Sequence, residues 1–294
     1  MEEARLEVSI FSLWSDKVER TGDQLPTKLF GYDVLGRLGE GAASVIYAVS
    51  KPKTGQVYAL KHVVRQSEKD DRFIAQLETE YEVSQAFKHP ALRRSVDLKM
   101  NRTLLRKVVD AALVMELVDG TPLDQELPED IGRVVSIFAQ AAAALGALHY
   151  LRYVHCDFKP HNIMLLGDGS IKLVDFGQAA RIGTAKERVQ GTPDFMAPEQ
   201  VKRKAVTERT DIYSFGASLY WALTGKRVPT MFTVEKSERK LLVEQTFPSP
   251  VQLRPAVGEG LSKLVMECVK VHPLARPATM GEVARRLEEA KQTG

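Results

Sequence analysis

Three polar residues stand close together in an otherwise apolar stretch, YVHCDFKPHNIML (153–165). Asp157 supplies a carboxylate, Lys159 an ammonium group and Asn162 an amide. A positioned carboxylate accepts a proton from a hydroxyl group, and a nearby cation stabilises the negative charge that develops during reaction. The stretch therefore raises the question of which chemistry these three groups serve together. Cys156, directly before the carboxylate, raises the question of how such a site is controlled.

A short hairpin is predicted next along the chain. Two apolar runs flank Asp168 and Gly169, a pair favoured for a two-residue type I′ turn. With that turn, paired residues sum to 337, and Asn162 lies directly across from Asp175, with Cβ atoms about 5 Å apart. An amide oxygen and a carboxylate are hard ligands that suit Mg²⁺, with phosphate oxygens and water completing its shell. Taken alone, the pair is better explained as two polar residues that merely cap a hairpin.

The elements that must position these residues divide the chain into two parts. β-Branched and aromatic residues bounded by Gly and Pro predict strands from Phe30 to Val64, and ALVMELV (112–118) predicts another. Residues 68–87 have helical spacing, and His89-Pro90 ends that helix. From residue 131 onward helical patterns dominate, apart from the hairpin. The predicted fold class is α+β, with a small β-rich lobe and a larger helical lobe.

The predicted boundaries are an extension at 1–28 and one two-lobed domain at 29–292, with lobes at 29–118 and 119–292. The extension contains the spacing of a short amphipathic helix. Packing on the domain and docking of a partner are both open for this helix. Its apolar residues are Ile10, Phe11, Leu13, Trp14 and Val18.

The composition excludes several functional classes. The 41 basic and 38 acidic side chains give a net charge of +3, which offers no reason to expect a nucleic-acid partner. Two cysteines exclude a disulfide scaffold and fit a reducing, cytoplasmic location. The segment 131–151 is long and apolar, but Arg133, Gln140 and His149 interrupt it, so we expect a buried helix and no membrane anchor.

The polar stretch resembles the catalytic loop of the protein kinases. In that family the residue matching Asp157 accepts the proton of the substrate hydroxyl, and the residue matching Asn162 binds metal. The match includes His155, whereas Cys156 replaces the family's arginine. Asp175-Phe176-Gly177 matches the family's metal-binding triplet in full. The resemblance thus implies that Asp157 and Lys159, together with Lys61 upstream, are catalytic. It also implies that Asn162 and Asp175 hold Mg²⁺.

The resemblance extends upstream through a glycine-rich turn and a strand lysine. LGEGAASVIY (38–47) resembles the loop that covers nucleotide phosphates, and Lys61 matches the lysine that holds the α- and β-phosphates. In the family this lysine pairs with a helix glutamate. Glu80 is the expected partner because it lies ten residues before Pro90, with Glu78 and Glu82 as competitors. The expected nucleotide-binding residues are Leu38, Gly39, Gly41, Ser44, Ile46, Ala59, Lys61, Glu80, Met115, Glu116, Val118 and Met164.

Further segments complete the resemblance, which spans about residues 31–290. Met115-Glu116-Leu117-Val118 resembles the inter-lobe linker, where the backbone of Glu116 and Val118 hydrogen-bonds an adenine edge. The segment 191–199 resembles the end of the activation segment. By the same analogy Glu199 pairs with Arg276, and Asp211 braces the backbone of the catalytic loop.

Three positions depart from the family pattern: one in the glycine-rich turn, one in the apolar spine and one in the catalytic loop. Ser44 stands at the third glycine of the turn, and Ser84 stands where an apolar spine residue is usual. Cys156 lacks the positive charge that reads a phosphate on the activation segment. We therefore hypothesise that activity does not depend on phosphorylation of the segment 178–190, whose single hydroxyl is Thr184. A redox-sensing role for Cys156 is disfavoured, because burial beside a carboxylate raises a thiol pKa.

The sequence is identified as a member of the serine/threonine branch of the protein kinase superfamily, resembling bacterial eukaryotic-type (Hanks-type) kinases. The resemblance implies ATP and Mg²⁺ as cofactors and proteins with Ser/Thr acceptors as substrates, with autophosphorylation expected. A pseudokinase acting as a nucleotide-binding scaffold is the alternative, and a small-molecule phosphotransferase is a second rival. We expect no nucleic-acid partner and no membrane contact, and we leave a homodimer open.

Overall fold

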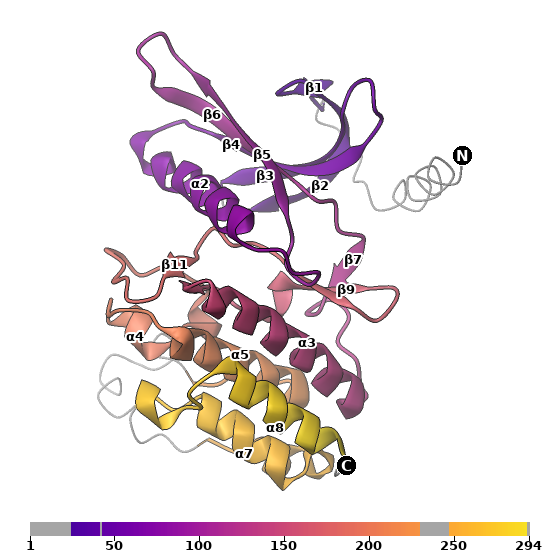
Figure 1. Cartoon of the computed structure of the whole chain (residues 1–294), viewed down its shortest axis with the longest axis vertical. Coiled ribbons are helices and arrows are strands. Elements are labelled where there is room, and N and C mark those ends of the chain that lie inside the picture. The colour runs from indigo at the N-terminus through magenta and orange to yellow at the C-terminus, as the bar shows by residue number, and fades with distance from the viewer. Residues whose placement is uncertain (1–24, 42, 230–246, 293–294) are drawn as a thin grey trace. The chain divides into compact units, whose positions relative to one another are not determined.

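The computed structural model describes residues 25–41, 43–229 and 247–292, which form two compact units. Unit 1 contains the described residues up to Gln85 together with Arg94–Val118. Unit 2 contains Ala86–Arg93 and the described residues from Asp119 onward. Unit 1 is rich in strands and unit 2 in helices (Figure 1), so the predicted bilobal α+β fold is confirmed. The amphipathic helix predicted around Trp14 lies outside the described residues.

A six-stranded antiparallel sheet forms most of unit 1, in the order β1-β2-β3-β4-β6-β5. The strand predicted at 112–118 ends at Met115 in the structure, three residues earlier than expected. The reason is that β6 pairs with both of its neighbours only as far as Met115. The edge strand β5 was not predicted, since its charged residues hide the alternation of a half-buried strand. The strands are β1 (Lys28–Leu29), β2 (Tyr32–Gly41), β3 (Ser44–Ser50), β4 (Val57–Val64), β5 (Ser95–Arg102) and β6 (Val108–Met115).

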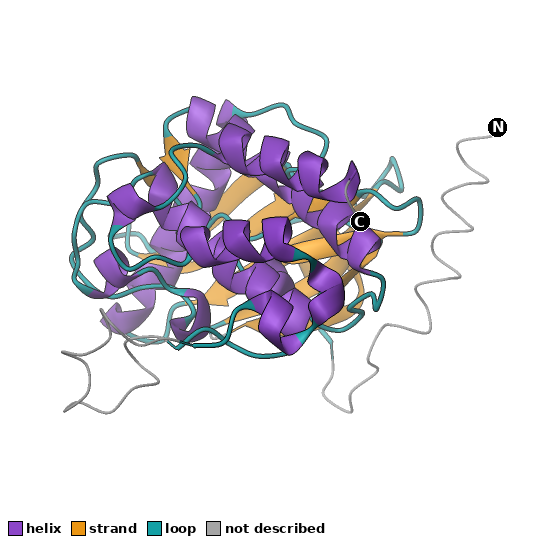
Figure 2. Cartoon of the chain, turned by 90° about the horizontal axis from the view of Figure 1, so that it is seen from below, coloured by secondary structure: helices purple, strands orange, loops and turns teal. Residues whose placement is uncertain are grey.

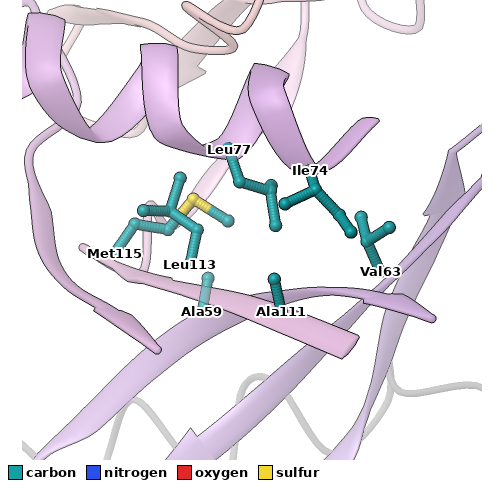
Figure 3. Close-up of a cluster of buried hydrophobic side chains, with 7 residues drawn as sticks. All are labelled: Ala59, Val63, Ile74, Leu77, Ala111, Leu113 and Met115. Atoms are coloured by element: carbon teal, nitrogen blue, oxygen red, sulfur yellow. The ribbon is translucent and has the colours of Figure 1, made fainter. Parts of the chain in front are cut away.

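Helix α2 (Asp71–Ala86) packs on this sheet through an apolar stripe (Figure 1). A 3-10 turn, Glu68–Asp70, precedes it and is capped by the side chain of Ser67. Ile74 and Leu77 point from the helix toward the strands, where they meet small and aliphatic side chains (Figure 3). Burial of this stripe fixes which face of α2 packs against the sheet. The strand residues of the cluster are Ala59, Val63, Ala111, Leu113 and Met115.

Unit 2 is built mainly from helices, which lie side by side in two views (Figures 1 and 2). Helix α3 packs against α5 and α8, and α7 packs against the same two helices. The helices are α3 (Ile131–Tyr150), α4 (Pro198–Val201), α5 (Glu208–Thr224), α6 (Pro250–Leu253), α7 (Glu259–Cys268) and α8 (Met280–Gln292), with 3-10 turns at Pro160–Asn162, Pro193–Phe195, Pro255–Val257 and Pro273–Ala275.

Two small sheets in unit 2 position the polar loop. One has the order β10-β9-β7 and the other pairs β11 with β8. The polar loop runs from the end of β8 to the start of β9, so a strand fixes each of its ends. These strands are β7 (Gly120–Pro122), β8 (Tyr153–Val154), β9 (Ile163–Leu166), β10 (Ile171–Leu173) and β11 (Ala180–Arg181).

Helix α3 is, among the described residues, the only helix long and apolar enough to cross a membrane by length and composition. Half of its most apolar window is buried inside the structure. Its buried side chains include Phe138 and Leu145, and Phe138 makes an edge-on contact with Phe215 of α5. Packing within unit 2 therefore accounts for the apolar composition of α3.

Candidate active site

An ion pair joins the strand lysine of unit 1 to helix α2. Lys61 Nζ lies 3.1 Å from Glu80 Oε2, and the glutamate is 1% exposed. Glu78 and Glu82 are exposed, because each successive residue of a helix turns by about 100°. The partner that the structure gives Lys61 is thus Glu80. A buried carboxylate is costly unless it is paired, so this contact fixes the orientation of both side chains.

The glycine-rich turn forms the hairpin between β2 and β3. Gly41 pairs with Ser44, and a Cβ atom on Gly41 would lie 2.7 Å from Ser44 Oγ. That distance is shorter than an ordinary contact, so a side chain at position 41 would require the hydroxyl of Ser44 to rotate away. Gly39 is paired with Ile46, and open space surrounds the position where its Cβ would stand.

Four of the expected nucleotide-binding residues belong to one apolar cluster. Ala59 and Met115 are buried members of the cluster beneath α2, and Leu38 and Ile46 are half-buried against it. Glu116, which follows Met115, donates its backbone N–H to Arg94 O (2.9 Å). An adenine edge would therefore have to meet the carbonyl of Glu116 and not its N–H.

The carboxylate of Asp157 is held from both sides in unit 2. Its Oδ1 accepts the backbone N–H of Thr192 (2.7 Å), and its Oδ2 accepts Lys159 Nζ (3.1 Å). Lys159 Nζ also donates to Thr192 Oγ1 (2.7 Å). The three residues form a closed ring of contacts that fixes the direction of the carboxylate. Thr192 was not predicted as a site residue, and only its place before Pro193 pointed to it.

Gly191 permits the close approach of Thr192 to the catalytic loop. Its φ is +124°, a conformation that side chains disfavour. A Cβ atom here would lie 3.2 Å from Cys156 O and 3.2 Å from Met196 Cε. Glycine is required at this position for both reasons. The sequence pattern placed Gly191 in the activation segment but gave no sign of this contact.

The backbone of the catalytic loop is braced by buried side chains from other elements. Asp211 of α5 accepts the N–H groups of His155 (2.8 Å) and Cys156 (2.9 Å), and also His149 Nε2 (2.8 Å). Gln200 of α4 donates to Cys156 O (2.8 Å). The predicted bracing by Asp211 is confirmed, whereas Gln200 was not predicted.

These contacts stabilise the strained backbone of Cys156 and the ionised carboxylate of Asp211. Cys156 has a φ of +65°, which costs a non-glycine residue about 1–3 kcal/mol. Burial opposes the ionisation of Asp211, but the hydrogen bonds from His149 and His155 hold its pKa below the ordinary 3.8. The loop geometry is therefore maintained by a charge-assisted network.

The Cys156 thiol is enclosed and unreactive. It is 1% exposed, packs with Val154 and Val206, and donates to Val154 O (3.6 Å). Burial raises the pKa of the Cys156 thiol, and the nearby ammonium group of Lys186 only partly opposes this. The predicted rise of the thiol pKa is confirmed. Because the thiolate is the form that reacts, a redox-sensing role is disfavoured.

Asn162 is bound into the loop that carries Asp157. It is 2% exposed, and its Nδ2 donates to Asp157 O (2.9 Å). Its backbone carbonyl accepts the N–H of Val174 (3.0 Å). Asn162 is thus fixed to the catalytic loop and to the strand that leads toward Asp175.

The predicted register of the β9–β10 hairpin was wrong by one residue. Observed pairs such as Met164 with Lys172 sum to 336, so Asn162 lies across from Val174 and not from Asp175. The reason is the turn: Leu166 pairs with Ser170, and a three-residue loop ends at Gly169, whose φ is +84°. This loop uses glycine in the left-handed region at its third position and not in a type I′ pair.

Asp175 itself lies just beyond the hairpin. It is half-buried and has a φ of +65°. The next residue, Phe176, is fully buried and packs against the rings of Phe87 and His155, each with a centroid separation of 5.3 Å. Packing of Phe176 therefore fixes the backbone next to Asp175. No group of three His, Cys, Asp or Glu side chains that could hold a metal occurs within the described ranges.

The predicted pairing of Glu199 with Arg276 is confirmed. Arg276 Nη1 and Nη2 donate to Glu199 Oε1 (2.8 Å) and Oε2 (2.9 Å), and both residues are buried. Thr210 also donates to Glu199 Oε1 (3.0 Å). A bidentate ion pair of this kind is strong and directional. It ties α4, and with it Gln200, to the body of unit 2.

Comparison with known proteins agrees with this arrangement. A probable serine/threonine-protein kinase of Clostridium acetobutylicum is 27% identical over 88% of this chain and 40% of its own length. Serine/threonine-protein kinase ULK3 of Homo sapiens is 30% identical over 85% of this chain and 53% of its own length. Serine/threonine-protein kinase pkn3 of Myxococcus xanthus is 29% identical over 86% and 48%. The chain thus spans about half the length of these relatives.

The family comparison covers both units. The model of the protein kinase domain matches residues 32–287, which include every residue of the site described above. The chain belongs to the protein kinase domain family.

Proposed function

We propose that this chain is a serine/threonine protein kinase that transfers the γ-phosphoryl group of ATP to Ser/Thr hydroxyls of proteins, its own included. The observation that carries the proposal is the clamped carboxylate of Asp157, bound by Thr192 N–H and Lys159 Nζ. The relatives described above are named as serine/threonine-protein kinases, which supports the choice of acceptor.

The proposed chemistry follows from the groups around Asp157. Its carboxylate accepts the proton of the acceptor hydroxyl, which makes the oxygen a better nucleophile. Lys159 places a positive charge beside the same carboxylate and stabilises negative charge as the phosphoryl group moves. Because Thr192 and Lys159 hold the base in one direction, little reorganisation accompanies the proton transfer.

The residues present fit ATP and Mg²⁺. Lys61, paired with Glu80, offers a cation for phosphate oxygens, and LGEGAASVIY (38–47) resembles the loop whose backbone N–H groups approach them in the family. The amide nitrogen of Asn162 donates a hydrogen bond to Asp157 O, so its amide oxygen is the atom that would bind a hard cation. We propose Asn162 and Asp175 as the ligands of Mg²⁺, which when bound neutralises charge on the phosphates.

Neither rival reading gains support. Ser44 and Ser84 are the best arguments for a pseudokinase. Ser84 is buried, and its Oγ accepts the N–H of Ser95 (2.5 Å), so this hydroxyl has a structural use. The four residues on which catalysis depends in the family are all present in the sequence: Lys61, Asp157, Asn162 and Asp175. The Glu199–Arg276 pair argues against a small-molecule phosphotransferase, because enzymes of that class with a related fold usually lack this segment and its arginine partner.

A cytoplasmic location is also proposed. Two observations support it. Cys156 and Cys268 are both free thiols, and both are buried. A reducing compartment suits a chain with this cysteine usage.

The test of the proposed function is transfer of labelled phosphate from ATP to a protein substrate. Asp157→Asn keeps the shape of the side chain but removes the base, so the rate should fall by about 10²–10⁴-fold while the protein remains folded. Asp168→Asn, at an exposed loop position, is the matched control and should match wild type. An inactive wild-type protein, or an Asp157→Asn variant as active as the control, would falsify the assignment.

A further inference from the structure

The hairpin of strands β5 and β6 in unit 1 ends in a tight turn, residues 102–107, which we call the β5–β6 turn. Arg106 N–H donates to Thr103 O (2.8 Å), so Leu104 and Leu105 occupy the two central positions of a β-turn. Figure 1 shows the loop between these two strands projecting at the upper left, clear of helix α2. The two leucines therefore stand at the tip of the hairpin.

The β5–β6 turn is held together by its backbone and by polar side chains. Thr103 N–H donates to Lys107 O (2.8 Å), and Lys107 N–H donates to Thr103 Oγ1 (3.2 Å). The guanidinium of Arg102 lies across the base of the turn, where its Nη1 donates to Arg106 O (3.2 Å). None of these contacts uses a leucine side chain, so the turn keeps its shape without them.

Both leucine side chains are open to solvent. Leu104 is 105% exposed and Leu105 is 92% exposed. Formation of the turn does not explain these residue types, because turns are rich in Gly, Pro, Asn, Asp and Ser. Nor does folding explain Arg106, whose φ of +63° lies in the left-handed region that favours glycine and asparagine. The tip thus carries side chains that the hairpin does not need for its own structure.

Three cations flank the two leucines. Arg102 precedes them on the β5 side, and Arg106 and Lys107 follow them on the β6 side. All three are exposed. No Asp or Glu occurs between residues 98 and 109. The apolar tip is therefore bordered by positive charge on both strands.

Three carboxylates border the hairpin, two on its strands and one at the start of α2, and each has a partner of its own. The pairs are Asp97 with Lys99 (3.0 Å), Asp110 with His62 (3.0 Å) and Asp71 with Arg65 (3.0 Å). Because these contacts already engage the carboxylates, the cations of the β5–β6 turn keep a positive local potential.

We propose that the β5–β6 turn is a contact site for an anionic lipid surface, in which Leu104 and Leu105 enter the acyl boundary and the three cations meet the headgroup phosphates. The order of the side chains favours a membrane. Apolar groups occupy the tip and cations stand one or two residues behind them, which matches hydrocarbon beneath a layer of negative headgroups. Long Arg and Lys side chains keep their charges at headgroup level while the tip is inserted. One turn of this size gives weak, reversible association.

Such a peripheral contact differs from a membrane anchor, and it replaces the expectation of no membrane contact. The 41 basic and 38 acidic side chains of the whole chain nearly cancel, which hides a turn with three cations and no carboxylate. In the proposed cytoplasmic location the membrane surface within reach is the cytoplasmic leaflet, which is negatively charged. The contact does not depend on phosphoryl transfer.

Sedimentation of the 294-residue chain with vesicles tests the leucines. Wild type should bind vesicles of phosphatidylcholine mixed with phosphatidylserine at low salt, and bind pure phosphatidylcholine vesicles more weakly. Leu104→Ser/Leu105→Ser should lower the partition coefficient at least tenfold, since full burial of one leucine is worth about tenfold or more. Leu274→Ser changes a leucine that is 71% exposed in unit 2, and this control should bind as wild type does. The unfolding midpoint should be unchanged in both variants, because these side chains are exposed.

A second pair of variants tests the cations at constant net charge. Arg106→Gln/Lys107→Gln should weaken binding to the anionic vesicles by about fivefold for each charge removed, and the remaining binding should depend less on salt. Lys263→Gln/Lys270→Gln removes two exposed charges from unit 2 and is the matched control. It should bind within about twofold of wild type, because screening limits the effect of charges far from the contact.

A dye at the tip reports insertion directly. Cys156 and Cys268 are buried, so a thiol-reactive dye that senses polarity should label the introduced thiol of Leu105→Cys selectively. Its emission should shift to the blue on anionic vesicles and be quenched by brominated acyl chains. The same dye on Leu274→Cys should show neither change. Emission at position 105 that is insensitive to vesicles overturns the proposal.

The other outcomes are equally decisive. Failure of wild type to bind anionic vesicles overturns the proposal, as does a Leu104→Ser/Leu105→Ser variant that binds as well as Leu274→Ser. The extension at 1–28 is the same in all variants, so the latter result would assign lipid binding to another part of the chain. Equal losses in the two charge variants overturn the role of the cations.

An analytical ultracentrifugation run without lipid distinguishes a second copy of the chain as the occupant. If wild type is a dimer and Leu104→Ser/Leu105→Ser is a monomer, the leucines contact another copy and the lipid proposal fails. A monomer in both supports it. Phosphoryl transfer to a soluble protein should be the same in wild type and in this variant, so failure of the proposed function would leave the lipid result standing.

Discussion

The two units hold their charged residues in different ways. In unit 1, Lys61 and Glu80 link a strand to a helix by a 3.1 Å ion pair, and the two elements otherwise meet through aliphatic side chains. In unit 2, Asp157 stands in a loop whose backbone is bound by α4 and α5 and whose residue Cys156 is strained. Strained backbone persists only where surrounding contacts over-determine it. The comparison teaches that the loop of unit 2 is built for one geometry, whereas the pair in unit 1 depends on where a helix lies.

The largest expected effect comes from removing the brace in unit 2. Asp211→Ala leaves the N–H groups of His155 and Cys156, and the ring of His149, buried without their acceptor. The free energy of unfolding should fall by about 3–5 kcal/mol, because buried donors lose a charged partner. Denaturant unfolding measures this directly. A loss no larger than that of a surface substitution, within about 0.5 kcal/mol, would show that the loop does not depend on its brace.

The acid side of the stability curve provides the control for this prediction. The pKa of Asp211 is lowered in the folded state, so its contribution to stability is present above 3.8, the ordinary value. That contribution is lost as pH falls below 3.8 and through the lowered value. The difference in unfolding free energy between wild type and Asp211→Ala should therefore shrink in this acid range. A difference that grows there contradicts the assignment.

A smaller effect is expected at Gly191, which also belongs to the clamp in unit 2. Gly191→Ala places a methyl group 3.2 Å from Cys156 O in a backbone conformation of φ +124°. The cost should be about 1–3 kcal/mol of stability, and the rate should fall because Thr192 N–H shifts from Asp157. Gly183→Ala is the matched control: its φ is +93°, but nothing lies within 4 Å of the added atom. Equal losses of activity in both variants would attribute the effect to strain and not to the contact.

Sequence reasoning predicted the charged residues of the site, Asp211 among them, and missed two uncharged residues that contact the catalytic loop. The ion-pair partners Glu199 and Arg276 were assigned from the family resemblance, because a charge pair depends on side chains that the pattern displays. Gln200 and Thr192 were not predicted as parts of the site. Gln200 donates to a carbonyl and Thr192 donates its N–H, and neither residue type by itself indicates such a contact.

The register error has a related cause. Asp168-Gly169 is compatible with two turns, and the loop length decides between them. The same glycine serves in both, so the sequence predicts the hairpin but not whether two or three residues form its loop. A difference of one residue changes which side chain faces Asn162. The coarse fold was predicted because hydrophobic spacing sets it, whereas edge strand β5 was missed because charges mask its alternation.

The smallest expected change in stability tests the other side of the comparison, in unit 1. Glu80→Gln keeps the shape of the side chain and an oxygen that accepts Lys61 Nζ but removes the charge. Stability should change by less than about 1 kcal/mol, since a neutral buried amide costs less to enclose than a carboxylate. The rate of phosphoryl transfer should still fall by about fivefold to tenfold, because a neutral acceptor holds the lysine about half as strongly. Glu78→Gln, exposed on the same helix, should alter neither quantity. If Glu80→Gln instead destabilises the chain as much as Asp211→Ala, the pair in unit 1 is as over-determined as the loop in unit 2, and the contrast between the units does not hold.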